Sequence, residues 1–220
     1  MKPLLLSALF ILATLGAAYA QENSGIKFNV GAGFSLLSNT FDQQATLSGA
    51  SLELKDTTGS FGFNGFVDIT QFITVNFGFR GAMGQLNRTA TWGTLSGTSN
   101  YSNSVSQFEL GGELKYPFQV NKTFSIAPKV GLNYIGFLGG SIGSTDVSSS
   151  TDEKQQFSPV YVTLGVDLNF DLDNQWFVRV PLDLGVGLNS KLSTAYYSGV
   201  TYSSSSSIGL RGGVEVGYSL

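Results

Sequence analysis

The chain has 220 residues, of which 42% are hydrophobic, 13% aromatic and 12% charged, with 28 glycines and a formal net charge of -3. It contains no cysteine and no histidine, which excludes disulfides, thiolate zinc sites and every catalytic centre built on imidazole. Basic residues do not outnumber acidic ones, so we expect no nucleic-acid partner. The composition therefore predicts a protein that is not an enzyme and that uses no catalytic residue, cofactor or metal.

The first twenty residues predict a secretory signal peptide. Lys2 precedes an apolar run from Leu4 to Leu15, and small residues follow up to Ala20. A transmembrane anchor would need about 20 apolar residues, and this run is shorter. We therefore divide the chain into a signal peptide, residues 1–20, and one mature domain, residues 21–220.

The mature chain alternates apolar with small or polar residues, which is the period of a β-strand. Eight segments show this alternation, and they cover 27–37, 59–69, 73–86, 105–116, 123–135, 157–170, 175–188 and 207–219.

The connections between these segments alternate in length. Long polar stretches cover 38–58, 87–104, 136–156 and 189–206, whereas the connections between them, 70–72, 117–122 and 171–174, are short. Long loops at one end and short turns at the other are typical of an up-and-down barrel. An even number of strands places both ends of the mature chain on the side of the short turns. Pro128 and Pro181 fall inside strands, where each removes a backbone donor, so we expect β-bulges there.

The two faces of the predicted strands differ sharply. One parity carries large apolar residues, while the other carries glycines and twelve charged residues, six of each sign. We predict that these charges form an ion-pair network in the lumen of a barrel. The twelve are Lys27, Asp68, Arg80, Glu109, Glu113, Lys115, Lys129, Asp167, Arg179, Asp183, Arg211 and Glu215.

Two kinds of barrel share this alternation. A soluble lipocalin-like barrel turns its apolar face inward, whereas a membrane barrel turns that face to lipid. Soluble surfaces are commonly about 25 to 35% charged, and the polar face here is dominated by glycine. We therefore favour an all-β fold, an eight-stranded antiparallel up-and-down transmembrane β-barrel, and keep the secreted soluble barrel as the minor alternative.

Aromatic residues gather toward the two ends of the predicted barrel, as in membrane barrels with an aromatic girdle at each interface. Those expected near the long loops are Phe61, Phe63, Phe108, Tyr134 and Phe157, and those near the short turns are Tyr116, Phe118, Phe124, Phe170, Trp176, Phe177 and Tyr218.

Two stretches also resemble a known group of proteins. Phe124–Tyr134, FSIAPKVGLNY, and Arg179–Gly187, RVPLDLGVG, are similar to segments of the small outer-membrane β-barrels that include OmpX, the OmpA barrel and the PorT-like proteins of Bacteroidetes. The resemblance implies a Gram-negative outer-membrane location after Sec-type export, contact with outer-membrane lipid, and insertion by the barrel-assembly machinery.

The function expected from the sequence is a non-enzymatic structural or surface role, in adhesion, recognition or envelope integrity, through the four long loops. An extracellular ligand would bind there, and the protein is expected to be a monomer. The alternative is a narrow channel for small solutes, with the lumen charges as its constriction. Eight strands enclose an interior that side chains fill, which disfavours the channel.

Overall fold

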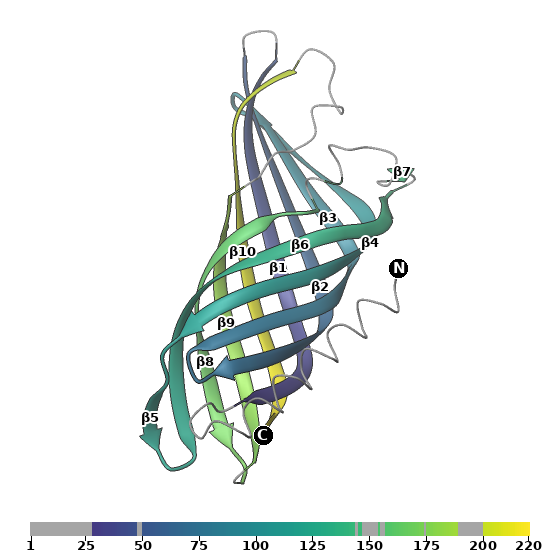
Figure 1. The fold of residues 1–220 in the computed structure, drawn as a ribbon. Helices are drawn as coiled ribbons and strands as arrows, with labels where there is room; N and C mark the ends of the chain where they lie inside the picture. The colour runs from purple at the N-terminus through teal and green to yellow at the C-terminus, as the bar shows by residue number, and fades with distance from the viewer. Residues whose placement is uncertain are drawn as a thin grey trace.

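The computed structural model describes residues 28–47, 50–143, 145–146, 154, 157–173, 175–188 and 200–220. These residues form one antiparallel sheet of ten strands (Figure 1). The strands are β1 (Asn29–Leu47), β2 (Ala50–Thr70), β3 (Ile73–Trp92), β4 (Leu95–Lys115), β5 (Phe118–Asn121), β6 (Phe124–Ile142), β7 (Thr145–Asp146), β8 (Val160–Asp171), β9 (Trp176–Gly187) and β10 (Val200–Ser219). No helix in the described part of the chain is both long and apolar enough to cross a membrane.

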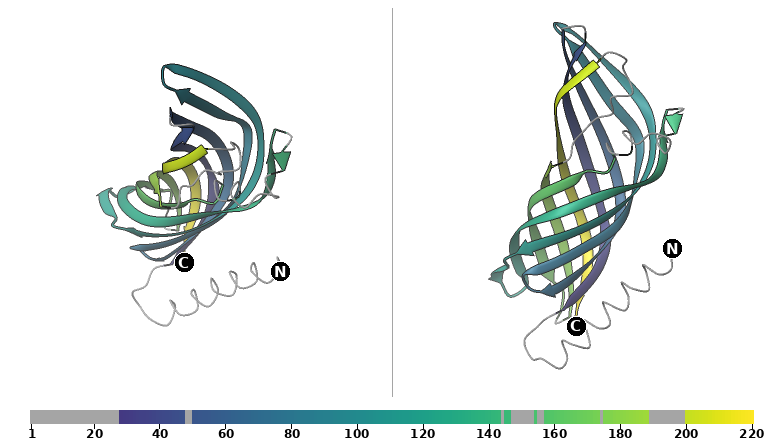
Figure 2. Two further views of the ribbon diagram at one scale, coloured as in Figure 1. Left: turned by 90° about the horizontal axis from the view of Figure 1, so that it is seen from above. Right: turned by 45° about the horizontal axis from the view of Figure 1, so that its top comes forward.

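Eight of the strands close into a ring. β1 pairs with both β2 and β10, and β4 pairs with β6, so that each ring strand has an antiparallel neighbour on both sides. The view along the molecule shows these strands wrapping around a common interior (Figure 2). β5 and β7 are short and pair only with β6 in the described sheet. The eight ring strands correspond to the eight alternating segments, and the predicted barrel is confirmed.

The exposure of the side chains decides between the two kinds of barrel. Large apolar residues of the ring strands face outward, with Phe34 54%, Phe79 60% and Leu164 60% exposed. The charged residues of the opposite face are buried inside the ring. A soluble barrel would show the reverse arrangement, so the outer surface is built for lipid and the chain is a transmembrane β-barrel.

Two residues assigned to the aromatic girdles lie elsewhere. Phe157 is buried with Val105 and Ile142, and Phe177 lies inside the barrel. Phe177 lies on the same face of β9 as its charged residues and glycines, and this face points into the lumen. Phe157 precedes β8, where the strand alternation does not yet apply.

The predicted boundaries of the long loops are wrong where the structure describes them. β1 and β2 pair without interruption from Asn29 and Asp68 to Leu47 and Ala50, through most of 38–58. β3 and β4 likewise pair up to Trp92 and Leu95, so that 87–104 is a hairpin with Gly93 at positive φ in its turn. β6 extends into 136–156, and β10 covers the end of 189–206. Polar strands form here because neighbouring strands satisfy their backbone groups, and cross-strand contacts such as Thr89 to Thr98 (3.2 Å) link their side chains.

The prediction of bulges at the two prolines is also wrong. Pro128 pairs with Val166 in regular register, and its carbonyl accepts a hydrogen bond from Tyr116 N at the end of β4. The backbone N–H that proline lacks would point to β4, at the place where β4 ends its pairing with β6. At Pro181 the β9–β10 ladder is interrupted between the pairs Leu182–Gly212 and Arg179–Glu215, with no change of register. The barrel accommodates each proline by a local loss of pairing.

Candidate functional site

The lumen of the barrel contains eleven of the twelve predicted charged residues. Each lies on the inward parity of its strand and is buried. Lys27 lies outside the described residues. Glycines on the same parity leave room for the long side chains: a Cβ at Gly131 would lie 2.8 Å from Glu113 Cγ, and one at Gly62 would lie 2.6 Å from Arg80 Cγ.

Arg211 links three strands at one level of the lumen. Its Nη1 lies 2.6 Å from Glu109 Oε1, its Nη2 2.9 Å from Glu113 Oε1, and its Nε 2.6 Å from Asp183 Oδ2. Glu109 is shared, because Arg80 Nε also donates to it and Asn133 Nδ2 donates to it at 2.5 Å. One guanidinium is thus held by carboxylates from β4 and β9.

Lys129 joins this level to the next one. Its ammonium lies 3.2 Å from Glu113 Oε2, 2.7 Å from Asp167 Oδ1 and 3.0 Å from Asp183 Oδ1. Glu113 and Asp183 also pair with Arg211. Asp167 Oδ2 lies 3.6 Å from Arg179 Nε, so each of these carboxylates has a second cationic partner.

Asp68 is the centre of the level nearest the short turns. It pairs with Lys115 Nζ at 2.8 Å and with Arg179 Nη2 at 2.6 Å, and Thr74 Oγ1 donates to it at 2.7 Å. Glu215 accepts a hydrogen bond from Asn64 and lies 3.9 Å from Arg179 Nη1. The structure thereby joins all eleven charged residues into one continuous network.

Two aromatic residues complete this end of the lumen. Arg179 Cζ lies 3.9 Å from the centroid of the Phe66 ring and 5.5 Å from that of Phe177, within cation–π range. Gly31 and Gly217 lie against the two rings, and a Cβ on either would come within 2.3 Å of a ring carbon. No lumen role was predicted for Phe66 or Phe177 from the sequence, although both lie on the strand face that carries the glycines and charged residues, which was a usable signal.

An apolar layer lies in the lumen on the other side of the charges. Leu37, Ile135 and Tyr161 form a buried cluster, and Tyr161 Oη donates a hydrogen bond to Asn39 Oδ1 at 2.9 Å. This layer was not predicted from the sequence, because its three residues lie singly on the polar faces of three strands and meet only when the ring closes.

The chemistry of the lumen is that of mutual neutralisation. Each of its carboxylates lies within an ion pair or a hydrogen bond. Glu109 and Glu113 both pair with Arg211, at 2.6 Å and 2.9 Å. Among the described residues, no group of three or more acidic side chains is arranged to hold a metal ion.

Comparison with known structures returned several bacterial barrels. The chain is similar to the outer membrane protein OprG from Pseudomonas aeruginosa, at 12% identity over 89% of this chain and 96% of that one, with a TM-score of 0.48. It is also similar to the outer membrane protease OmpT from Escherichia coli (12% identity, 90% and 99% covered, TM-score 0.46) and to Ail, the attachment invasion locus protein of Yersinia pestis (12%, 88% and 98%, 0.40).

Comparison with curated proteins returned no significant match. Among protein families, the autotransporter β-domain matches residues 12–212, which include nearly all of the described barrel. The chain therefore belongs to the autotransporter β-domain family.

Proposed function

We propose that this protein is a non-enzymatic outer-membrane barrel that binds an extracellular polypeptide along the sheet protruding from its ring. The observation that carries the proposal is the unequal length of the strands. β1, β2, β3, β4 and β10 continue well beyond the ends of β8 and β9 (Figure 1).

The protruding sheet has an exposed edge at β4. This strand pairs with β3 as far as Leu95, but its pairing with β6 begins only at Asn103. Every residue from Leu95 to Asn100 is exposed, and among the described residues none pairs with this stretch on the side away from β3. Unpaired strand edges bind extended peptides by adding a strand, with main-chain hydrogen bonds supplying the affinity.

The composition of this edge also suits the binding of an extended peptide. Natural edge strands are commonly protected by Lys, Pro or bulges, and the segment Leu95–Asn100, LSGTSN, contains neither charge nor proline. The contents of the lumen favour a surface role over the narrow channel or transport through the barrel, because ion pairs and buried side chains fill it at several levels.

We also propose that the protein is exported through a signal peptide, residues 1–20, and inserted by the barrel-assembly machinery. It would be a monomer and a member of the OmpX-like and PorT-like proteins. Fold likeness alone does not give a function, and the support comes from the protruding edge and from a sequence without histidine or cysteine.

A proline substitution tests the edge directly. Ser102 O accepts a hydrogen bond from Gly143 N, away from β3, so the N–H groups of Asn100 and Thr98 also point away from β3 by strand alternation. Asn100→Pro removes one of these donors and leaves the β3 ladder intact, and Asn100→Ala is the matched control. Cells displaying the protein are tested against an array of extended peptides from extracellular proteins.

We expect the wild type and Asn100→Ala to bind a subset of these peptides and Asn100→Pro to lose them. Equal binding by all three proteins, or no peptide bound by any, would contradict the proposed function. Removing residues 88–92 and 95–99, with Gly93 and Thr94 kept as the turn, shortens the β3–β4 hairpin. This deletion should abolish the same peptide binding.

A further inference from the structure

The wall of the barrel is open between β2 and β3. Their ladder stops at the pair Thr57–Asn87 and resumes at Phe61–Gly81, so that three residues of β2 face five of β3. Both stretches remain paired on their other sides, to β1 and β4. The opening is therefore a local separation of two strands inside an otherwise continuous wall.

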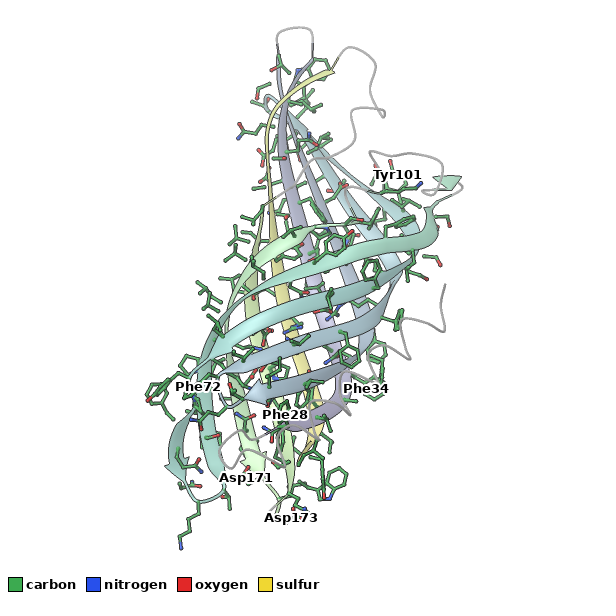
Figure 3. The ribbon with its side chains drawn as sticks, in the orientation of Figure 1. Phe28, Phe34, Phe72, Tyr101, Asp171 and Asp173 are labelled. Carbon is green, nitrogen blue, oxygen red and sulfur yellow. The ribbon has the colours of Figure 1, made fainter. Side chains whose placement is uncertain are left out.

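A cavity of about 820 Å³ lies at this opening. Residues from both faces of the wall line it. Those on the lipid-facing side include Leu36, Phe61, Phe63, Phe79 and Leu138, and those on the lumen side include Leu37, Ser60, Arg80 and Gln107. Phe34 packs against two of the rim aromatics, stacked on Phe61 at 5.4 Å and edge-on to Phe63 at 5.6 Å, and it points outward from the barrel (Figure 3).

Arg80 supplies an unused polar group at the inner side of this cavity. Its Nε donates to Glu109 and its Nη2 donates to Ser35 Oγ at 2.8 Å, whereas its Nη1 has no hydrogen-bond partner among the described residues. The residue is only 4% exposed. Buried guanidinium N–H groups without acceptors are costly, and Nη1 lies beside Gly62, which also lines the cavity.

The charge around Arg80 is only partly compensated. Glu109 is its acidic partner among the described residues, and Arg211 shares that carboxylate at 2.6 Å. An Nη1 with two free N–H groups and a partly compensated positive charge suit a single carboxylate, whose two oxygens are both acceptors. A phosphate group carries more acceptor oxygens than these two N–H groups can satisfy.

We propose that the opening binds a long-chain fatty acid from the surrounding membrane. The alkyl chain lies along the apolar rim on the lipid-facing side, and the carboxylate passes between β2 and β3 to accept a hydrogen bond from Arg80 Nη1. The ligand enters from the bilayer because the rim residues are the ones that face lipid.

The barrel contains a second hollow that serves as an internal comparison. It measures about 530 Å³ and is lined by Leu164, Leu182 and Leu210 around Gly212, with Arg211 behind them. All three nitrogens of that guanidinium are already bound to carboxylates. This hollow therefore offers a carboxylate no guanidinium nitrogen that lacks a partner.

Photo-crosslinking of the whole protein in lipid nanodiscs tests the site. The probes are a diazirine analogue of palmitic acid and its methyl ester, and mass spectrometry locates the labelled peptides. We expect the acid to label β2 and β3 around residues 59–81 and to be displaced by oleate. The methyl ester should label the same residues about tenfold less, because a charge-assisted hydrogen bond is lost.

Two glycine variants provide a matched pair that leaves the ion pairs untouched. A Cβ at Gly59, which lines the opening, or at Gly112, which lies outside both hollows, would meet nothing within 4 Å. Gly59→Leu should block labelling at β2 and β3, and Gly112→Leu should leave it unchanged. Arg80→Gln should lower labelling by the acid to that of the ester.

Labelling spread evenly around the barrel, equal labelling by acid and ester, or full labelling of Gly59→Leu would each overturn the proposal. Heat-dependent migration on a gel confirms that every variant is folded before labelling is compared.

Discussion

Arg211 shows how strongly single residues of the lumen depend on one another. Its guanidinium is bound by Glu109, Glu113 and Asp183, each at hydrogen-bond distance. Truncating Arg211 leaves these carboxylates crowded in a buried space, with less positive charge to neutralise them.

We predict that Arg211→Ala lowers the free energy of unfolding by about 3 to 5 kcal/mol, the range for breaking a buried ion pair from one side. Lys122→Ala is the control, because Lys122 is exposed in the turn between β5 and β6, and its loss should change stability by no more than about 0.5 kcal/mol. Urea titration in detergent micelles measures both. Equal effects of the two substitutions would mean that the lumen network contributes nothing to stability.

Glycines on the two faces of the barrel wall differ in how closely other atoms approach them, as the lumen-facing Gly33 and the lipid-facing Gly112 show. A Cβ at Gly33 would lie 2.0 Å from Val214 O, a backbone atom that cannot move aside easily, whereas one at Gly112 would meet nothing within 4 Å. Gly33→Ala should cost about 1 to 3 kcal/mol through overpacking, and Gly112→Ala should gain about 0.5 to 1 kcal/mol from strand propensity. The fraction refolded, measured by gel mobility with and without heating, should fall only for Gly33→Ala.

At the scale of single elements, the turn between β8 and β9 is organised by one carboxylate. Asp173 accepts hydrogen bonds from the backbone N–H groups of Gln175 at 2.7 Å and Trp176 at 2.6 Å. Figure 3 shows Asp173 at the end of the barrel, near Asp171 and outside the membrane-facing wall. The hydrogen bonds from Trp176 and Gln175 lower the pKa of this carboxyl below its usual 3.8.

A lowered pKa in the folded state means that ionised Asp173 stabilises the hairpin above its unfolded pKa, and that this stabilisation is lost as pH falls through the folded pKa. Asp173→Ala should therefore lower the melting temperature at neutral pH and have progressively less effect below the usual carboxyl range. Thermal unfolding of both proteins at several pH values measures this. A difference that does not change with pH would show that the charge of Asp173 has no part in the turn.

Element by element, the sequence predicted the ring better than its extensions. Alternation of Phe, Val and Leu with glycine located all eight ring strands, because the face that contacts lipid must be apolar and the face that lines the narrow lumen carries small and charged residues. The extensions of β3 and β4 beyond Asn87 and Asn103 carry Ser, Thr and Asn on both faces, so they resemble loops in sequence. Pairing with a neighbouring strand makes them strands, and a neighbour cannot be read from local composition.

The candidate site was also only partly predictable. The alternation along each strand placed the charged residues on one face, but only the closed ring specifies which of them form pairs. Arg211 of β10 reaches Glu109 and Glu113 of β4 across the lumen, and no spacing in the sequence encodes that contact. The opening between β2 and β3 was also invisible, because it arises from a register shift and leaves the alternation intact.

For the whole molecule, the contents of the lumen predict electrical behaviour. Ion pairs occupy two levels, the rings of Phe66 and Phe177 flank Arg179 at one end, and Leu37, Ile135 and Tyr161 close the other. We predict little or no steady conductance in a planar bilayer. A stable conductance that Arg211→Ala or Glu113→Ala removes without changing stability would instead support the channel alternative.

The face of each strand that meets lipid distinguishes a membrane barrel from a soluble one. The chain has no cysteine, so a single introduced thiol can carry a fluorescent label at successive positions of β8 in liposomes that contain a lipid-borne quencher. We predict strong quenching at Leu164→Cys, where the native side chain is 60% exposed, and weak quenching at Thr163→Cys, where it is 8% exposed, with the same alternation along the strand. Equal quenching at both positions, or stronger quenching at Thr163→Cys, would contradict a barrel with its apolar face in the membrane.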